Sequence, residues 1–140
     1  MANSLTLACK LAGVHLAIAA PEEFQPRKDL LAWKQGTGSA MWTTSVKEAM
    51  QDADFVYTDV WVSMGFEEES KRRMSILAPY RLDMATLRMA KPGAKVLHCL
   101  PAHRGDEITD EVMDSSASIV FDQAENRLHV QKAIMALLMA

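Results

Sequence analysis

Short apolar runs alternate with helical segments along almost the whole sequence, and this alternation constrains the fold more than any other feature. Five runs have the apolar, β-prone character of strands: 15–20, 41–44, 55–60, 95–100 and 118–121. Helical spacing, capping or stop signals mark the segments 3–12, 27–34, 45–51, 67–77, 109–113 and 124–139, with a short helix after Asp83. Strands that alternate with helices pair in parallel through right-handed crossovers. We therefore predict an α/β fold with a Rossmann-like, doubly wound and mainly parallel sheet flanked by helices, in which the run 15–20 is buried on both faces.

The size and charge of the chain exclude several classes of partner. Its 140 residues suit one domain, and its formal net charge of -3 offers no basic field for nucleic acid or an anionic membrane. No apolar run approaches the roughly 20 residues of a membrane span, and no secretory pattern opens the chain. Cys9 and Cys99 lie far apart without metal-type spacing, which favours free thiols in a reducing compartment. We expect a cytoplasmic protein.

Candidate site residues follow the third strand. In a doubly wound sheet, ligands bind beyond the carboxyl ends of the strands. Asp59 lies at the end of the run 55–60, and the loop after it contains Ser63, Met64 and Gly65, where the glycine lets the chain turn. Asp59 and Ser63 could together hold an amine. An aspartate at a strand end also serves as a helix cap or a loop hydrogen-bond acceptor, so local sequence leaves both interpretations open.

A second candidate group lies at the end of the strand at 95–100. Cys99 lies in the sequence His98-Cys99-Leu100-Pro101, and Arg104 comes shortly after it. A histidine and an arginine nearby could favour the thiolate, which would make Cys99 a nucleophile or a proton acceptor. A buried structural cysteine is the alternative, and it suits Cys9 better because Cys9 lies inside a helix without a charged cluster nearby.

A third polar group, at 122–127, opens the last helix directly after a predicted strand. Arg127 near a helix N-terminus could stabilise negative charge on a ligand. Asp122 and Glu125 could equally be helix caps. Taken alone, none of the three groups is decisive.

The order and the amino-acid sequences of these segments together resemble the second domain of ornithine carbamoyltransferases. The segments are YTDVWVSMG at 57–65, HCLP at 98–101, TDEV at 109–112 and VFDQAENRLH at 120–129. The resemblance covers nearly the whole chain. Its Ser-Met-Gly loop at 63–65 favours ornithine over the aspartate, putrescine and acetylornithine relatives.

The resemblance implies a role for each candidate residue. Asp59 and Ser63 would bind the α-amino end of ornithine, with the Met64 backbone contributing. Cys99 and the Leu100 carbonyl would face the reacting δ-amine and the carbamoyl group, and an arginine, Arg127, would hold the carbamoyl oxygen. The implied reaction is attack of a neutral δ-amine on carbamoyl phosphate, giving citrulline and phosphate in arginine metabolism. It requires no metal or organic cofactor, and no ligand spacing suggests one.

The sequence also departs from the resembling enzymes. Their first domain is absent, with its Ser-x-Arg-Thr and His-Pro-x-Gln motifs, and so is the strand that carries the asparagine for the ornithine carboxylate. That strand would be central, between those at 15–20 and 55–60, so its loss would leave backbone groups unpaired. We expect one domain, 1–140, truncated at its N-terminus and inactive without a carbamoyl-phosphate domain. The apolar stripe Val130, Ile134 and Leu137 on the last helix predicts self-association.

Two other functions remain to be weighed against the half-enzyme. A non-catalytic amino-acid-binding or assembly domain would keep this fold and part of the ornithine pocket. A small nucleotide-using enzyme is less well supported, because no Gly-x-Gly-x-x-Gly or other glycine-rich phosphate loop occurs.

Overall fold

Helices and strands alternate in the structure as the sequence predicts. The computed structural model describes residues 1–62 and 70–139. Its elements are α1 (Ala2–Leu11), β1 (His15–Ala19), η1 (Glu22–Phe24), α2 (Lys28–Ala32), β2 (Ser39–Thr43), α3 (Val46–Met50), β3 (Phe55–Thr58), α4 (Ser70–Leu77), η3 (Ala78–Tyr80), α5 (Met84–Leu87), β4 (Lys95–His98), α6 (Asp110–Met113) and α7 (Val120–Leu138). Parallel strands flanked by helices confirm the predicted α/β class. Residues 67–69 of the helix predicted at 67–77 lie outside the described ranges.

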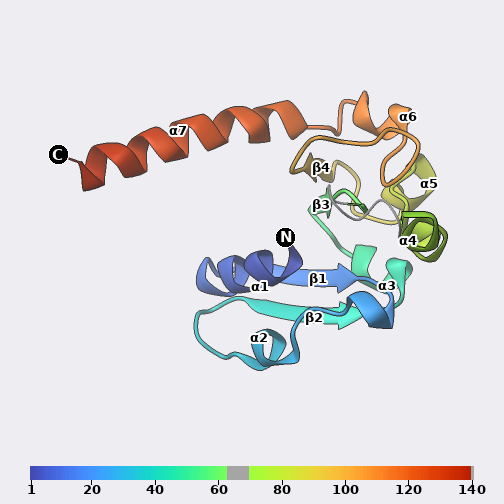
Figure 1. Ribbon diagram of the computed structural model, residues 1–140, viewed down its shortest axis with the longest axis horizontal. Coiled ribbons are helices and arrows are strands. Elements are labelled where there is room, and N and C mark those ends of the chain that lie inside the picture. Colours follow the sequence, from blue (N-terminus) through green and yellow to red (C-terminus); the bar gives the residue numbers. More distant parts are fainter. Residues whose placement is uncertain (63–69, 140) are drawn as a thin grey trace.

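The strands pair in two separate parallel ladders. β1 pairs with β2, with Ala19 opposite Thr43 at the end of the ladder. β3 pairs with β4, with Thr58 opposite His98. Within residues 1–62 and 70–139, no ladder joins β1 to β3. Figure 1 shows the strands in the order β2, β1, β3, β4 from bottom to top.

The prediction of a strand at 118–121 is wrong. Ser118 makes only an isolated parallel bridge to Val96, and α7 already begins at Val120. Val96 donates its N–H to the Ala117 carbonyl and accepts from the Ile119 N–H, so the segment pairs with β4 for one step. The β-branched residues favoured a strand, but the Val120 side chain enters the core from the first turn of a helix instead.

Two short helices begin where the sequence predicts. The Ser45 side chain accepts a hydrogen bond from the Glu48 N–H at 3.2 Å, which caps α3. The Asp83 carboxylate accepts from the Thr86 N–H at 2.8 Å and caps α5. Each cap satisfies a backbone donor that the first helical turn leaves without a partner.

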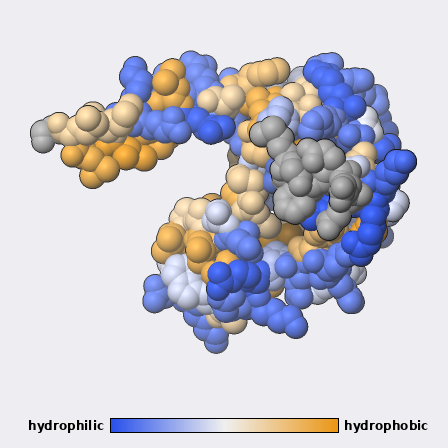
Figure 2. All heavy atoms as spheres, in the orientation of Figure 1, coloured by the Kyte–Doolittle hydropathy of each residue, from blue (hydrophilic) through white to orange (hydrophobic). Residues whose placement is uncertain are grey.

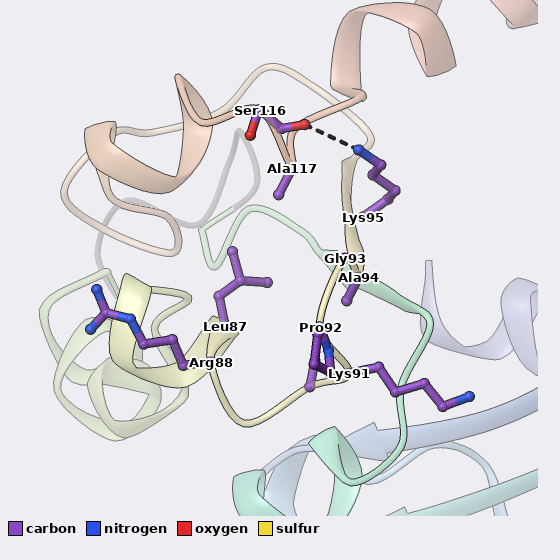
Figure 3. Close-up of a pocket in the computed structure, with 10 residues that line it drawn as sticks. Leu87, Arg88, Lys91, Pro92, Gly93, Ala94, Lys95, Ser116 and Ala117 are labelled. Carbon is purple, nitrogen blue, oxygen red and sulfur yellow. Dashed lines mark hydrogen bonds between the residues drawn. The ribbon is translucent and has the colours of Figure 1, made fainter.

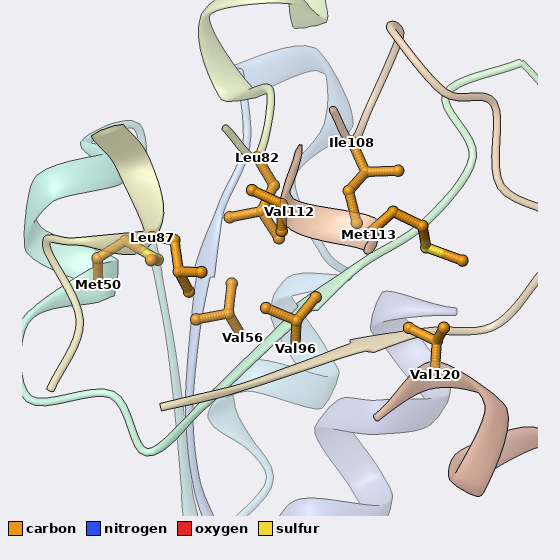
Figure 4. Close-up of a cluster of buried hydrophobic side chains, with 9 residues drawn as sticks. All are labelled: Met50, Val56, Leu82, Leu87, Val96, Ile108, Val112, Met113 and Val120. Atoms are coloured by element: carbon orange, nitrogen blue, oxygen red, sulfur yellow. The ribbon is translucent and has the colours of Figure 1, made fainter. Parts of the chain in front are cut away.

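The hydrophobic core lies on one face of the β3–β4 ladder. Val56 and Val96 point from the strands toward α5 and α6, which return over that face (Figure 4). Because side chains alternate across a strand, Tyr57 and the residues after Thr58 and His98, which are Asp59 and Cys99, point toward the opposite face. The core residues are Met50, Val56, Leu82, Leu87, Val96, Ile108, Val112, Met113 and Val120.

A buried lysine joins the helices beside the β1–β2 ladder. Lys10 on α1 is only 4% exposed, and its ammonium group donates to the carbonyls of Leu30, Leu31 and Trp33 at 2.6–2.8 Å. The three N–H groups are thereby matched by three carbonyls at the C-terminal end of α2. Lys10 therefore holds α2 against α1 by hydrogen bonds.

The strand β1 is more exposed than the sequence predicts, and the helix α7 is exposed as well. β1 is half-buried or exposed at every position, so the prediction of a strand buried on both faces is wrong. Its second edge has no partner strand in the described part of the chain, and α7 extends away from the rest (Figure 1). Figure 2 shows a hollow between α7 and the β1–β2 lobe, with hydrophobic atoms along the bordering side of α7. None of the described helices is long and apolar enough to cross a membrane.

Candidate active site

The parallel register of β3 and β4 brings Asp59 and Cys99 together. Thr58 lies opposite His98 at the last paired position, so the next residue on each strand lies at the same edge of the ladder. Paired residues in a sheet point to the same side. The Cys99 thiol donates a hydrogen bond to Asp59 Oδ1 at 2.7 Å, although the two residues are 40 positions apart in sequence.

The carboxylate of Asp59 is fixed through one of its two oxygens. Oδ1 accepts from the Cys99 thiol and also from the Val60 backbone N–H at 2.8 Å. Among the described residues, no side chain or backbone group bonds the other oxygen. An ionised carboxylate accepts several hydrogen bonds, so the second oxygen is suited to an ammonium group. The pair can therefore hold an amine beside a protonated thiol.

The expectation that neighbouring His and Arg side chains favour the Cys99 thiolate is wrong. Burial first, and then hydrogen bonding and charge from Asp59, raise the pKa of the Cys99 thiol above its ordinary value. The Arg104 guanidinium is held instead by Asp110 at 2.8 Å and Asp114 at 2.7 Å. Cys99 therefore remains a thiol near neutral pH, which suits proton donation or orientation better than nucleophilic attack.

His98 points into the core, where it pairs with a carboxylate that sequence analysis missed. His98 Nε2 lies 3.1 Å from Glu107 Oε1, and both side chains are fully buried. His98 Nδ1 accepts the Leu100 backbone N–H at 2.8 Å, so that nitrogen carries no proton. The ring is therefore the neutral tautomer that donates through Nε2 to Glu107. The same Glu107 oxygen also accepts the His103 backbone N–H at 2.6 Å.

This buried pair shapes the loop that carries the thiol. Leu100 has φ of 55°, in the left-handed region that β-carbon sterics disfavour, and a cis peptide bond joins it to Pro101. A leucine in this conformation must be held by its surroundings. The hydrogen bond from the Leu100 N–H to the buried His98 ring holds it directly.

Two polar side chains that the sequence did not single out complete the group around Cys99. Gln123, in the first turn of α7, accepts the His98 backbone N–H through Oε1 at 3.0 Å. Tyr57 is half-buried on β3, where burial first and then the charge of Cys99 raise its pKa to about 12. A glutamine at a helix start and a tyrosine in a strand are common, so only the strand register could have pointed to them.

Arg127, another predicted site residue, does not contact the Asp59–Cys99 pair. Arg127 is exposed on α7, one turn beyond Gln123 and on the same helix face. In the described ranges, no hydrogen bond or ion pair joins Arg127 to Asp59 or Cys99. Ser63 and Met64 lie outside the described residues.

The hollow drawn in Figure 3 is separate from this site, and the described residues form no metal-binding group. The hollow in Figure 3 lies at the start of β4, between Lys91 and Lys95, whereas Cys99 follows the end of that strand. Across residues 1–62 and 70–139, no three His, Cys, Asp or Glu side chains are grouped as metal ligands would be.

The chain is similar to one family along nearly its whole length. The model of the aspartate/ornithine carbamoyltransferase Asp/Orn binding domain matches residues 1–138. Ornithine carbamoyltransferase of Geobacter metallireducens is 51% identical over 141 residues, which are 99% of this chain and 46% of that protein. The enzyme of the same name from Methanoculleus marisnigri is 48% identical over 139 residues, 99% of this chain and 45% of that protein.

Solved structures agree with the sequence comparisons. Ornithine carbamoyltransferase from Pyrococcus furiosus has a TM-score of 0.92 and 44% identity, covering 99% of this chain and 46% of that chain. Ornithine carbamoyltransferase from Gloeobacter violaceus has a TM-score of 0.88 and 40% identity, over 100% of this chain and 48% of that one. The chain spans less than half the length of the relatives that it matches.

Proposed function

The chain belongs to the family of aspartate/ornithine carbamoyltransferase Asp/Orn-binding domains, and from that premise we propose that it is the ornithine-binding half of an ornithine carbamoyltransferase. The complete enzyme would convert carbamoyl phosphate and L-ornithine to L-citrulline and phosphate. The observation that carries the proposal is the hydrogen bond between Cys99 and Asp59 at the adjoining ends of β3 and β4. The names of the related enzymes indicate ornithine as the substrate. The pair provides a carboxylate that can bind an amine, beside a group that carries a proton.

The proposed reaction forms a carbon–nitrogen bond and breaks a carbon–oxygen bond. The neutral δ-amine of ornithine attacks the carbonyl carbon of carbamoyl phosphate, phosphate leaves with its bridging oxygen, and the amine loses a proton. Asp59 and Ser63 bind the α-amino end of ornithine with the Met64 backbone. Cys99 and the Leu100 carbonyl orient the reacting amine and carbamoyl group, and Arg127 stabilises the carbamoyl oxygen. Alignment of the two substrates supplies much of the rate.

We also propose that the complete protein places a further strand between β1 and β3. Those strands have no ladder between them in the described residues, and each has a second edge without a partner strand there. Unpaired strand edges inside a sheet are unfavourable because their N–H and C=O groups lack partners. A cytoplasmic assembly with a carbamoyl-phosphate domain would satisfy them, and this chain of one domain would then act only in that assembly.

L-Ornithine should bind this chain weakly, with a Kd above about 10 μM, which corresponds to roughly -7 kcal/mol. Asp59→Asn should weaken that binding at least about tenfold, because it removes the charge that pairs with the α-ammonium group. Titration followed by NMR would measure both constants, with Asp54→Asn as control, since Asp54 pairs with Lys91 on the surface. Binding of L-aspartate as tight as that of ornithine would contradict the proposed substrate. If Asp59→Asn leaves the affinity for ornithine unchanged, the role of Asp59 is only that of a structural hydrogen-bond acceptor.

The isolated chain should self-associate at micromolar concentration, most simply as a two-fold dimer. Val130, Ile134 and Leu137 on α7 are 57%, 49% and 82% exposed, which leaves an apolar stripe in water. Sedimentation velocity should show that Ile134→Glu shifts the chain toward monomer. Lys132→Glu, on the opposite side of α7, should not. A stable monomer that binds no hydrophobic dye would contradict this prediction.

A further inference from the structure

The edge of β4 that faces away from β3 is paired by a segment that stops after one step. The Val96 N–H donates to the Ala117 carbonyl at 2.8 Å, and the Ile119 N–H donates to the Val96 carbonyl at 3.0 Å. Donors on one edge of a strand recur at every second residue, so the next donor on this edge is the His98 N–H. The chain has turned into α7 at Val120 by that point, so it offers no further strand carbonyl.

The Gln123 side chain takes the place of that carbonyl. Gln123 Oε1 accepts the His98 N–H at 3.0 Å. The N–H can only donate, so the orientation of the Gln123 amide is fixed, with its oxygen toward the strand. His98 is only 1% exposed, and a donor there without an acceptor would be unfavourable. A side chain in the first turn of a helix therefore completes the edge of a strand.

The helix α7 is attached to the rest of the chain at its beginning. Of its 19 residues, only Val120 is buried in the described chain, and the helix extends away from the β3–β4 ladder (Figure 1). Its direction depends mainly on Val120 in the core, on the Ile119 N–H and on Gln123. The Gln123 bond is the anchor farthest along the helix. Arg127 follows one turn later, and both residues border the same shallow hollow on α7.

We infer that Gln123 is a positioning residue, which fixes the first turn of α7 to the end of β4 and thereby sets where Arg127 lies relative to Cys99. Cys99 directly follows His98, so one hydrogen bond joins the position before the thiol to the helical turn before the arginine. The importance of this bond for carbamoyl transfer rests on the proposed function, in which Arg127 stabilises the carbamoyl oxygen. The anchoring of α7 does not rest on it.

Hydrogen exchange of the full chain, followed by NMR and corrected for intrinsic rates, tests the anchor without turnover. Gln123→Ala removes the acceptor in a residue of high helix propensity, so the His98 amide should exchange about five- to tenfold faster, the equivalent of one net hydrogen bond. The amide of residue 123, which bonds the Ile119 carbonyl at 3.0 Å, should also exchange faster because the turn is released. The Leu87 amide, bonded to the Asp83 carbonyl in α5, is the internal reference.

Two further variants separate the hydrogen bond from other effects of the substitution. Gln123→Glu keeps an acceptor for the His98 N–H and should keep the protection of both amides. Gln131→Ala makes the same change at an exposed position two turns farther along α7, so it should leave both amides as in the wild type. Gln123→Met, which also lacks the amide oxygen, takes the place of Gln123→Ala if circular dichroism shows that Gln123→Ala does not fold.

In an enzyme reconstituted with a carbamoyl-phosphate domain, Gln123→Ala should lower kcat by about tenfold and change KM for ornithine by less than about twofold. The reason is that Arg127 acts on charge that develops in the transition state. Gln123→Glu should recover most of kcat. If Gln123 acts through Arg127, the substitution Gln123→Ala should have little further effect in an Arg127→Gln background.

Faster exchange of both amides in Gln123→Ala, together with protection in Gln123→Glu, supports the inference. Unchanged exchange at either amide, or losses of kcat that simply add in the double variant, overturn it. A reconstituted wild-type enzyme that forms no citrulline would count against the proposed function. The exchange measurement would still decide whether Gln123 anchors α7.

Discussion

Cys99→Ala should lower citrulline formation by roughly 100-fold or more in an enzyme reconstituted from this chain and a carbamoyl-phosphate domain. The thiol donates a hydrogen bond to the carboxylate that we propose binds the amine, with 2.7 Å between Cys99 Sγ and Asp59 Oδ1. Groups that orient or exchange a proton with the reacting atoms typically contribute factors of 10² to 10⁴. A colorimetric assay for citrulline with saturating ornithine and carbamoyl phosphate would measure kcat for the wild type and the variant.

Cys9→Ala is the matched control and should change kcat little. Cys9 is also a half-buried free thiol with a pKa raised by burial, but it lies on α1, away from the ends of β3 and β4. Equal losses from the two substitutions would point to packing rather than chemistry. The chain without the second domain should form no measurable citrulline, because the other substrate's contacts are missing. Robust turnover by the chain alone would refute the half-enzyme proposal.

The positions of four strands along the sequence could be predicted because they depend on local patterns. Apolar runs identified β1, β2, β3 and β4 within one or two residues, and Ser45 and Asp83 cap helices as their positions indicated. Parallel strands also predict that residues following their ends lie together. The sequence analysis selects Asp59 and Cys99 because ligands bind beyond the carboxyl ends of such strands. Their contact follows from the register of one ladder.

Contacts made by buried polar side chains could not be predicted in the same way. Glu107 is one of 18 acidic residues, and nothing in its local sequence marks it as the fully buried partner of His98. Lys10 resembles a surface lysine of a helix, yet it is buried by the three carbonyls that it caps. Such contacts depend on which separate elements pack together, and the periodicity of a helix or strand does not predict this.

Exposure was mispredicted for a related reason. The apolar run of β1 has the composition of a strand buried on both faces, but burial requires neighbours as well as composition. In the described chain β1 has β2 on one side, and α7 extends away instead of packing over it (Figure 1). The strand is therefore less buried in the described chain than its composition predicts.

Glu107→Ala should lower the free energy of unfolding by about 3–5 kcal/mol. The substitution leaves the His98 Nε2–H and the His103 backbone N–H without their acceptor, and each buried unpaired donor is unfavourable by about 1–3 kcal/mol. Removing one partner of a fully buried pair carries a penalty of this size. Urea unfolding followed by circular dichroism would measure it. Glu111→Ala, at an exposed position on α6, should change stability by no more than about 0.5 kcal/mol.

The contribution of the Glu107 charge should disappear in acid. Burial raises the pKa of Glu107, but hydrogen bonds from His98 and the His103 N–H outweigh burial and hold the pKa below its ordinary value of 4.5. A carboxylate whose pKa is lower in the folded state stabilises that state above the unfolded value, and this stabilisation is lost as the pH falls through the folded value. Glu107→Gln keeps an acceptor for both donors but has no charge to lose. The stability difference between wild type and Glu107→Gln should therefore be constant from pH 7 to about 5 and shrink below pH 4.5, whereas a difference that grows in acid would mean that folding raises the Glu107 pKa.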